Sequence, residues 1–299
     1  HIWSTLGLVL LLLTGIMLFY SAALPDFASM RDHSTGWRQR LGKRLARGWV
    51  GTDVQWRTLR MRIGMFGTFY FLILVFVNFL ISTDFGQSMV PGWRDAIFPM
   101  YHTVSGFQAG VAGVVIALYF SRKYMKLEKY IHLDAFWSLG RLLFALTLLW
   151  IYFFYSSFIV FWYGRSMNDI ATLDLLIKGP MIYAFFAGMI LLWFVPWWIL
   201  IWNKVRRGTG AMVVGSFVIL LGLLIDRIRT FVPAWSVPPE RIHEKWLTVI
   251  PETYYPTVFD ILIIVGGISM VAVTVMLMTR VLPVLSVWQV QEFNLLSKP

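Results

Sequence analysis

Long apolar stretches alternate with short polar connections along almost the whole chain. Seven of these stretches reach the ~20 residues that an α-helix needs to cross the hydrocarbon core of a bilayer. They lie at about residues 2–24, 63–83, 95–120, 134–162, 179–202, 211–234 and 257–280. The pattern predicts an all-α polytopic membrane protein in which seven transmembrane helices are arranged as helix bundles.

No linker of low complexity and no clear short repeat separates the apolar stretches, so we interpret residues 1–299 as a single transmembrane domain. The composition agrees with a membrane protein, because 58% of the residues are hydrophobic, 14% are charged and the mean hydropathy is +0.69. Since the chain begins with His rather than Met, we expect that an N-terminal part is missing and that the full-length chain has further spans.

Basic residues are concentrated on alternate connections. Residues 25–62 carry nine Lys and Arg, 121–133 carry four and 203–210 carry three, whereas the connections between them carry one or two each. The positive-inside rule therefore places the basic connections and the C-terminus in the cytoplasm, and we expect a multi-pass protein of the bacterial cytoplasmic membrane. This orientation code and contact with membrane lipid account for the net charge of +11, so we expect no nucleic-acid partner.

The chain contains no Cys and five His. Iron–sulfur clusters and covalent c-type haem need Cys ligands, and a b-type haem within a bundle needs two His inside spans. His102 is the one histidine that falls well inside a predicted span. We therefore expect no metal or haem in this chain, and any redox chemistry would use a diffusible substrate or the cofactors of partner chains.

Ionisable residues gather near the outer ends of the predicted spans. The set comprises Asp84, Asp95, His102, Asp226, Arg227 and Asp260. Ionisable side chains inside a membrane usually face a cavity, a partner or a transport pathway. At ~1.5 Å per residue, His102 lies roughly 10 Å below the outer end of its span. All six residues fall in the outer third of the membrane, where they could converge if the helices form a bundle.

Each of these residues also has a structural interpretation. Asp95 would suit the dipole in the first turn of its helix. His102 could be a hydrogen-bonded packing residue, and Asp226–Arg227 could form a structural ion pair to a neighbouring helix. These alternatives stay open for single residues, but six such groups at one depth exceed what anchoring requires.

A smaller set of polar residues lies near the inner side. Asp134 begins a predicted span, and Arg141 follows seven residues later on the same face. Arg141 could pair with Asp134 or extend its guanidinium to the lipid headgroups.

Quinol oxidation and cation transport would need polar groups at different depths of the membrane. Quinol oxidation needs an apolar cleft for the ring and a proton acceptor near each hydroxyl group, for which carboxylates and neutral imidazole are suited. A cation transporter would place carboxylates nearer the midplane, commonly beside broken helices. The position of the cluster in one leaflet favours a lipid-soluble substrate, although Pro180, Pro196 and the Gly266–Gly267 pair keep the transporter alternative open.

Eight motifs follow one another over nearly the whole chain. They are LPDFASMRD, GWVGTDVQW, STDFGQSMVPGWRDAIFPMY, HLD, FIVFWYGR, DRIRTFVP, YYPTVFDILI and TRVLPVLSVWQVQE. In this order and spacing the chain resembles the NrfD-like (polysulfide reductase membrane subunit) family. Within that family it is most similar to the two large membrane subunits of bacterial alternative complex III, and the run GRLLFALTLLWIYFFYSSFIVFWYGR favours the second paralogue.

The resemblance implies a membrane subunit of a quinol:electron-acceptor oxidoreductase that uses menaquinol or another quinol. Quinol would bind near the periplasmic face. Electrons would pass to a peripheral iron–sulfur subunit and then to c-type cytochrome subunits, and a paralogous NrfD-like membrane subunit would lie in the same complex. The resemblance also implies a proton path through polar residues of the bundle.

Single residues follow from the same resemblance. Asp84 matches the aspartate of the DF…S…PGW motif, Asp226 and Arg227 match an acidic–Arg pair, and Asp260 matches the aspartate after YYPT. The chain departs from the quinol-binding paralogue at two positions. Asn78 stands where that paralogue usually has His, and Ser157 stands where it often has Glu.

We therefore predict three overlapping sets of site residues and no metal ligands. The catalytic residues are Asp84 and His102; the quinol-binding residues are Asn78, Asp84, Asp95 and His102; and the proton path comprises Asp226, Arg227, Asp260, Arg141 and Asp134. The alternative functions are a structural anchor for peripheral redox subunits and a proton or ion transporter.

Overall fold

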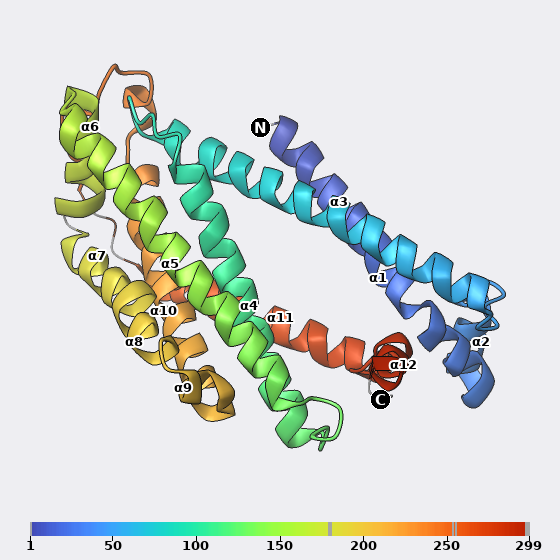
Figure 1. Cartoon of the computed structure of the whole chain (residues 1–299). Helices are drawn as coiled ribbons and strands as arrows, with labels where there is room; N and C mark the ends of the chain where they lie inside the picture. Colours follow the sequence, from blue (N-terminus) through green and yellow to red (C-terminus); the bar gives the residue numbers. More distant parts are fainter. Residues whose placement is uncertain (1, 179–180, 253, 255, 297–299) are drawn as a thin grey trace. The chain divides into compact units, whose positions relative to one another are not determined.

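A computed structural model describes residues 2–178, 181–252, 254 and 256–296 of the chain, and the structural statements below concern these residues. The elements that it describes are all helical (Figure 1). Among the described residues, seven helices are long and apolar enough to cross a membrane. The predicted class, an all-α polytopic membrane protein, is confirmed.

The packing of the chain divides it into two units, which we describe separately. The first consists essentially of Val75–Tyr254, and the second of Ser4–Leu74 together with Tyr255–Pro299. The helix Asp53–Phe85 runs through the boundary between Leu74 and Val75. A single domain over residues 1–299 stays a prediction.

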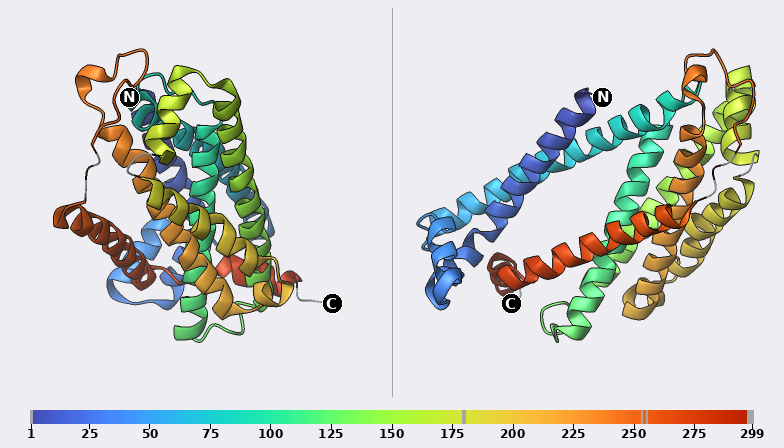
Figure 2. Two further views of the ribbon diagram at one scale, coloured as in Figure 1. Left: turned by 90° about the vertical axis from the view of Figure 1, so that its left-hand side faces the viewer. Right: turned by 180° about the vertical axis from the view of Figure 1, so that it is seen from behind.

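The first unit contains the larger number of helices. After the end of α3 (Asp53–Phe85) it comprises η1 (Gln87–Met89), α4 (Phe98–Tyr124), α5 (Leu133–Gly164), α6 (Met167–Leu173), the π-helix η2 (Asp174–Lys178), α7 (Ile182–Met189), the π-helix η3 (Ile190–Phe194), α8 (Val195–Leu200), α9 (Asn203–Arg207), α10 (Thr209–Trp235) and η4 (Pro239–Arg241). Helix α4 packs between α5 and α10, and α10 also packs against α7 and α8 (Figure 2). Its core includes Leu143, Trp150, Met212 and Ile219, which are almost completely buried.

Within the predicted span 179–202, the helix α7 (Ile182–Met189), the wide π-helical turn η3 (Ile190–Phe194) and the helix α8 (Val195–Leu200) follow one another without a gap. Residues 179 and 180, and with them the predicted break at Pro180, lie outside the described residues. The π-helical turn η3 directly precedes α8, in which Pro196 occupies the first turn. Proline has no backbone N–H, so a carbonyl group in the preceding turn loses its usual α-helical partner. The wider hydrogen-bond spacing of a π-helical turn leaves fewer such groups without a partner. The Gly266–Gly267 pair lies inside a continuous helix, Val258–Val281.

Gly222 of α10 packs closely against Leu191 and Leu192 of the π-helical turn η3. A Cβ atom at residue 222 would lie 2.8 Å from Cβ of Leu191 and 2.9 Å from Cγ of Leu192. We expect Gly222→Ala to lower the free energy of unfolding by about 1–3 kcal/mol, because the added methyl group overpacks the contact. Thermal unfolding of the purified chain in detergent micelles measures this loss. Gly113→Ala is the control, since nothing lies within 4 Å of its Cβ position and alanine favours the helix by up to ~1 kcal/mol. Equal melting temperatures of the two variants would contradict the tight packing.

The second unit is built from α1 (Ile2–His33), α2 (Gly36–Leu45), the first part of α3, α11 (Val258–Val281) and α12 (Val287–Leu296). Its core includes Leu24, Phe27, Trp49 and Leu59. Helices α1 and α3 run beside each other in opposite directions (Figures 1 and 2). Both helices extend well beyond the predicted apolar spans, into the basic connection 25–62.

Candidate functional site

A cleft opens at one end of the first unit, where the start of α4 meets the ends of α5 and α10. It has about 480 Å³ of empty space, counting the part that is open to the outside. Its walls are formed by Trp93, Asp95, Phe98, Tyr101, Phe154, Ser157, Phe158, Phe161, Thr172, Leu173, Leu176, Ile177, Arg229 and Thr230. Mostly apolar and aromatic walls with a few polar groups are typical of a site for a small organic ligand.

Asp95 places a fixed carboxylate on the wall of this cleft. Its Oδ1 accepts hydrogen bonds from the backbone N–H groups of Ile97 (2.8 Å) and Phe98 (3.2 Å) at the start of α4. Its Oδ2 accepts a hydrogen bond from the hydroxyl group of Ser157 on α5. Since both oxygens are held, the carboxylate has one defined position between the two helices.

Ser157 therefore has a clear role in the structure. By the resemblance described above, this serine stands where the quinol-binding paralogue often has Glu. Its hydroxyl group holds the Asp95 carboxylate, so an acidic group is present beside position 157 although the position itself carries none. The carboxylate of the cleft comes from the start of α4 instead of from α5.

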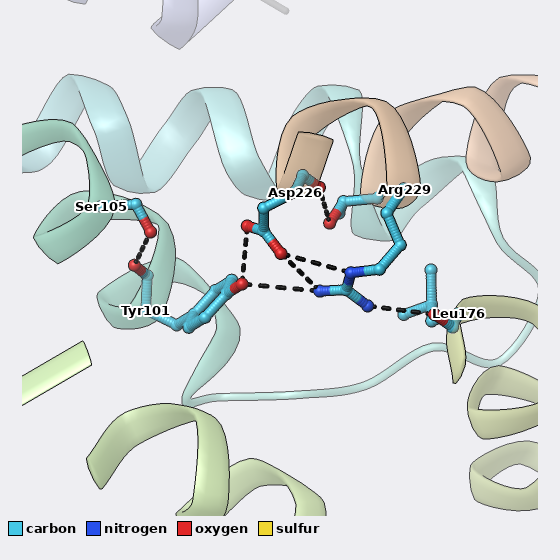
Figure 3. A network of polar contacts seen from close by, with 6 residues as sticks. Tyr101, Ser105, Leu176, Asp226 and Arg229 are labelled. Atoms are coloured by element: carbon cyan, nitrogen blue, oxygen red, sulfur yellow. Dashed lines mark hydrogen bonds and ion pairs between the residues drawn. The ribbon is translucent and has the colours of Figure 1, made fainter. Parts of the chain in front are cut away.

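A buried polar network lies at the inner wall of the cleft (Figure 3). The hydroxyl group of Tyr101 donates to Oδ2 of Asp226 at 2.6 Å. The Arg229 guanidinium donates to Oδ1 of Asp226 through Nη2 (2.7 Å) and Nε (3.2 Å), and its Nη1 donates to the carbonyl oxygen of Leu176 at 3.0 Å. The side chains of Arg229 and Asp226 are only 6% and 3% exposed. Each charge is therefore compensated inside the protein rather than by water.

The ion-pair partner of Asp226 is Arg229 and not Arg227. Residues three apart lie on the same face of a helix, whereas adjacent residues point in different directions. Arg227 instead donates from Nη2 to the backbone carbonyl oxygen of His102 at 3.1 Å. Its Nη1 is buried and has no hydrogen-bond partner among the described residues. Among the described residues the ion pair of Asp226 therefore lies within α10, rather than with a neighbouring helix as the structural alternative had it.

Asp95 lines the cleft, but the other three predicted quinol-binding residues do not. His102 is buried next to Phe231, with the two rings edge to face and their centroids 5.7 Å apart. Asn78 lies against α4, where its Oδ1 is 3.3 Å from the position of a Cβ atom at Gly106. Asp84 lies in the last turn of α3, partly buried. The roles predicted for these three residues stay predictions.

Two of the predicted proton-path residues lie at the other end of the first unit. Asp134 is in the first turn of α5, and Arg141 is 16 residues before Ser157, or about 24 Å along the helix. The guanidinium of Arg141 lies 4.0 Å from the centre of the Trp137 ring. No ion pair among the described residues joins Arg141 to Asp134. Neither residue belongs to the cleft.

Asp260, the remaining proton-path residue, belongs to the second unit. Its Oδ2 accepts hydrogen bonds from the backbone N–H and the hydroxyl group of Thr257, both at 2.7 Å. This arrangement caps the N-terminus of α11. Asp260 therefore has a structural role as a helix cap.

Three wall residues of the cleft were missed as site residues from the sequence. These residues are Trp93, Tyr101 and Arg229. The spacing of three residues between Asp226 and Arg229 was the sequence signal that could have identified Arg229 as the ion-pair partner of Asp226. The indole N–H of Trp93 is buried and has no partner among the described residues. A buried donor without a partner at the wall of a cleft is a natural contact for a ligand or a water molecule.

Comparison with known families agrees with this architecture. The family model described as "Polysulphide reductase, NrfD" matches residues 3–239, a range that includes every residue of the cleft. The chain belongs to the NrfD family, whose members are integral-membrane subunits of quinol oxidoreductases and typically partner with iron–sulfur subunits. No curated protein matches the chain significantly.

Proposed function

We propose that this chain is a membrane subunit of an alternative complex III-like quinol:acceptor oxidoreductase and that the cleft binds the ring of menaquinol or another quinol. The observation that carries the proposal is the combination of aromatic walls, the fixed carboxylate of Asp95 and the unpartnered indole N–H of Trp93. A quinol is a flat apolar ring with a hydroxyl group at each end. The cleft offers apolar walls to the ring and polar groups to its oxygens.

In this proposal Asp95 and Tyr101 serve the two hydroxyl groups. Oxidation of a quinol to a quinone releases two electrons and two protons. Asp95 would accept one proton directly at Oδ2. The hydroxyl group of Tyr101 would accept the other while it passes its own proton to Asp226, to which it is already hydrogen-bonded. The electrons would go to an iron–sulfur cluster of a partner subunit, and Trp93 would donate a hydrogen bond to a quinone oxygen.

The distribution of charge supports a periplasmic position of the cleft. The basic connections 121–133 and 203–210 join the helix ends opposite the cleft. With those connections in the cytoplasm of a bacterium, the cleft faces the periplasm and the C-terminus is cytoplasmic. A paralogous membrane subunit, a peripheral iron–sulfur subunit and c-type cytochromes complete the complex that we propose. Asp226 is the predicted proton-path residue that adjoins the cleft.

Quinone binding tests the proposal most directly. We expect Trp93→Phe to weaken binding of a short-chain menaquinone about tenfold, because the variant keeps the ring and loses one hydrogen-bond donor, worth about 1–1.5 kcal/mol. Equilibrium binding of the radiolabelled quinone to the complex in nanodiscs measures the affinity. Trp235→Phe is the control, since the Trp235 indole lies at the same end of the unit but donates to the carbonyl oxygen of Phe85 at 3.0 Å. Equal affinities in the two variants would contradict the cleft as the quinone site. A structural anchor predicts no saturable binding at all.

A further inference from the structure

A second cleft, in the second unit, is lined by two arginines that have no acidic partner. It lies where α1 meets the start of α3 and has about 790 Å³ of empty space, counting its open part. Arg47 and Arg62 stand on its walls together with the rings of Tyr20 and Trp49. No ion pair joins either arginine to a carboxylate in the part of the chain that the structure describes. The cleft therefore presents uncompensated positive charge.

Arg47 directly follows Ala46, the C-cap of α2, and its guanidinium contacts an aromatic ring. Its φ angle is +41°, in the left-handed region that residues other than glycine rarely adopt. The guanidinium lies 5.6 Å from the centre of the Tyr20 ring, within the range of a cation–π contact. The Tyr20 hydroxyl group donates to the carbonyl oxygen of Leu45 at 2.8 Å, which fixes the ring.

The loop that follows Arg47 is also fixed. The side-chain oxygen of Gln55 accepts hydrogen bonds from the backbone N–H groups of Val50 (3.0 Å) and Gly51 (2.9 Å). The side-chain nitrogen of the same residue donates to the carbonyl oxygen of Gly48 at 3.3 Å. The wall of the cleft therefore has a defined shape before any ligand binds.

An apolar groove shares Tyr20 with this cleft and leads away from it. The groove lies between α1 and α3 and is lined by Leu8, Leu12, Gly15, Ile16, Phe19 and Tyr70. Between Tyr20 and Leu8 it extends about 18 Å along α1. This length is close to half of the ~30 Å thickness of the hydrocarbon core of a bilayer. The part of the groove from Tyr20 to Leu8 thus has about the length of one leaflet, and the groove continues past Tyr20 to Phe27.

We infer that the cleft and the groove together bind one anionic glycerophospholipid. Its phosphate would lie between Arg47 and Arg62, since guanidinium groups bind phosphate oxygens through paired, charge-assisted hydrogen bonds. One of its acyl chains would follow the groove along α1. The sequence places this end of the helices at the cytoplasmic surface, where anionic lipids are abundant. The inference is independent of quinol binding at the other cleft.

Lipid selectivity tests this inference. The complex is reconstituted in nanodiscs of phosphatidylcholine that contain a small fraction of labelled phosphatidylglycerol, and native mass spectrometry measures which lipid stays bound. We expect Arg47→Gln with Arg62→Gln to lower the preference for phosphatidylglycerol about 30-fold, because each basic residue near an anionic lipid contributes roughly fivefold. The preference is a ratio within one preparation, so it does not depend on the folded fraction.

The control also removes two positive charges, both from the first part of α3. Arg57 and Arg60 also lie near the start of α3 but line a different cleft. We expect Arg57→Gln with Arg60→Gln to change the preference for phosphatidylglycerol by less than about threefold. These two arginines lie outside the proposed binding site, and salt screens their attraction to more distant headgroups. Equal losses in the two double variants would show diffuse attraction to the membrane surface and would overturn the inference.

Two further measurements separate the headgroup from the acyl chain. Inorganic phosphate added to the complex at millimolar concentration should not displace the bound lipid; displacement would assign the cleft to a free anion instead. Leu12→Trp fills the groove and leaves both arginines in place. We expect it to shorten the residence of phosphatidylglycerol at least fivefold, and an unchanged residence time would show that no acyl chain occupies the groove.

Discussion

Arg229→Met is expected to lower the free energy of unfolding of the first unit by about 3–5 kcal/mol. Asp226 and Arg229 are almost completely buried, and the guanidinium supplies two hydrogen bonds to one oxygen of the carboxylate. Methionine has a similar volume but no charge, so the variant would leave a buried carboxylate with only the Tyr101 hydroxyl group as partner. Chemical denaturation of the purified complex in detergent, followed by tryptophan fluorescence, measures the loss.

Two further variants show whether the loss comes from the unpaired charge. Adding Asp226→Asn to Arg229→Met removes the charge and keeps an oxygen for Tyr101, so it should recover more than half of the lost stability. Arg241→Met breaks an exposed pair, in which Arg241 and Glu244 are 3.9 Å apart and both 38% exposed. We expect a loss below about 1 kcal/mol there. A similar loss in the buried and the exposed variants would contradict the network.

Asp95→Asn is expected to reduce the kcat of quinol oxidation by the assembled complex about 10²- to 10⁴-fold, the range for removal of a general base. Asparagine keeps an oxygen that can accept the hydrogen bonds of Ile97 and Phe98, so the start of α4 should stay intact. It cannot accept a proton from the quinol at neutral pH. Steady-state turnover with a soluble electron acceptor measures the effect, and the melting temperature should change little.

The matched control is another carboxylate at the same end of the unit. Asp174 pairs with Lys178 at 3.1 Å and does not line the cleft, so Asp174→Asn should leave turnover within about twofold of the unmodified complex. Unchanged turnover in Asp95→Asn would support the structural-anchor alternative. If Asp84→Asn reduces turnover more than Asp95→Asn does, the proton acceptor is Asp84, the aspartate of the DF…S…PGW motif. That result would contradict quinol oxidation in the cleft.

The sequence alone determined the class of the protein and the places where its helices cross the membrane. In a bilayer every backbone polar group must be satisfied within the protein, so runs of ~20 apolar residues can only be helices. The motif STDFGQSMVPGWRDAIFPMY, residues 82–101, was also identified from the sequence, and it contributes Trp93, Asp95 and Tyr101 to the cleft. Depth in the membrane could be estimated from the position of each residue along its span.

Only the tertiary structure decided which of the polar residues meet. The lipid-facing surface of a membrane helix is about as apolar as its buried face, so the hydrophobic pattern does not show how each helix is rotated about its axis. Depth therefore grouped Asp84, His102 and Arg227 with Asp95, but the rotation and packing of α4, α5 and α10 bring Asp95 to Ser157 and Tyr101 to Asp226. The chemistry of the cleft depends on these contacts between helices, which no single span determines.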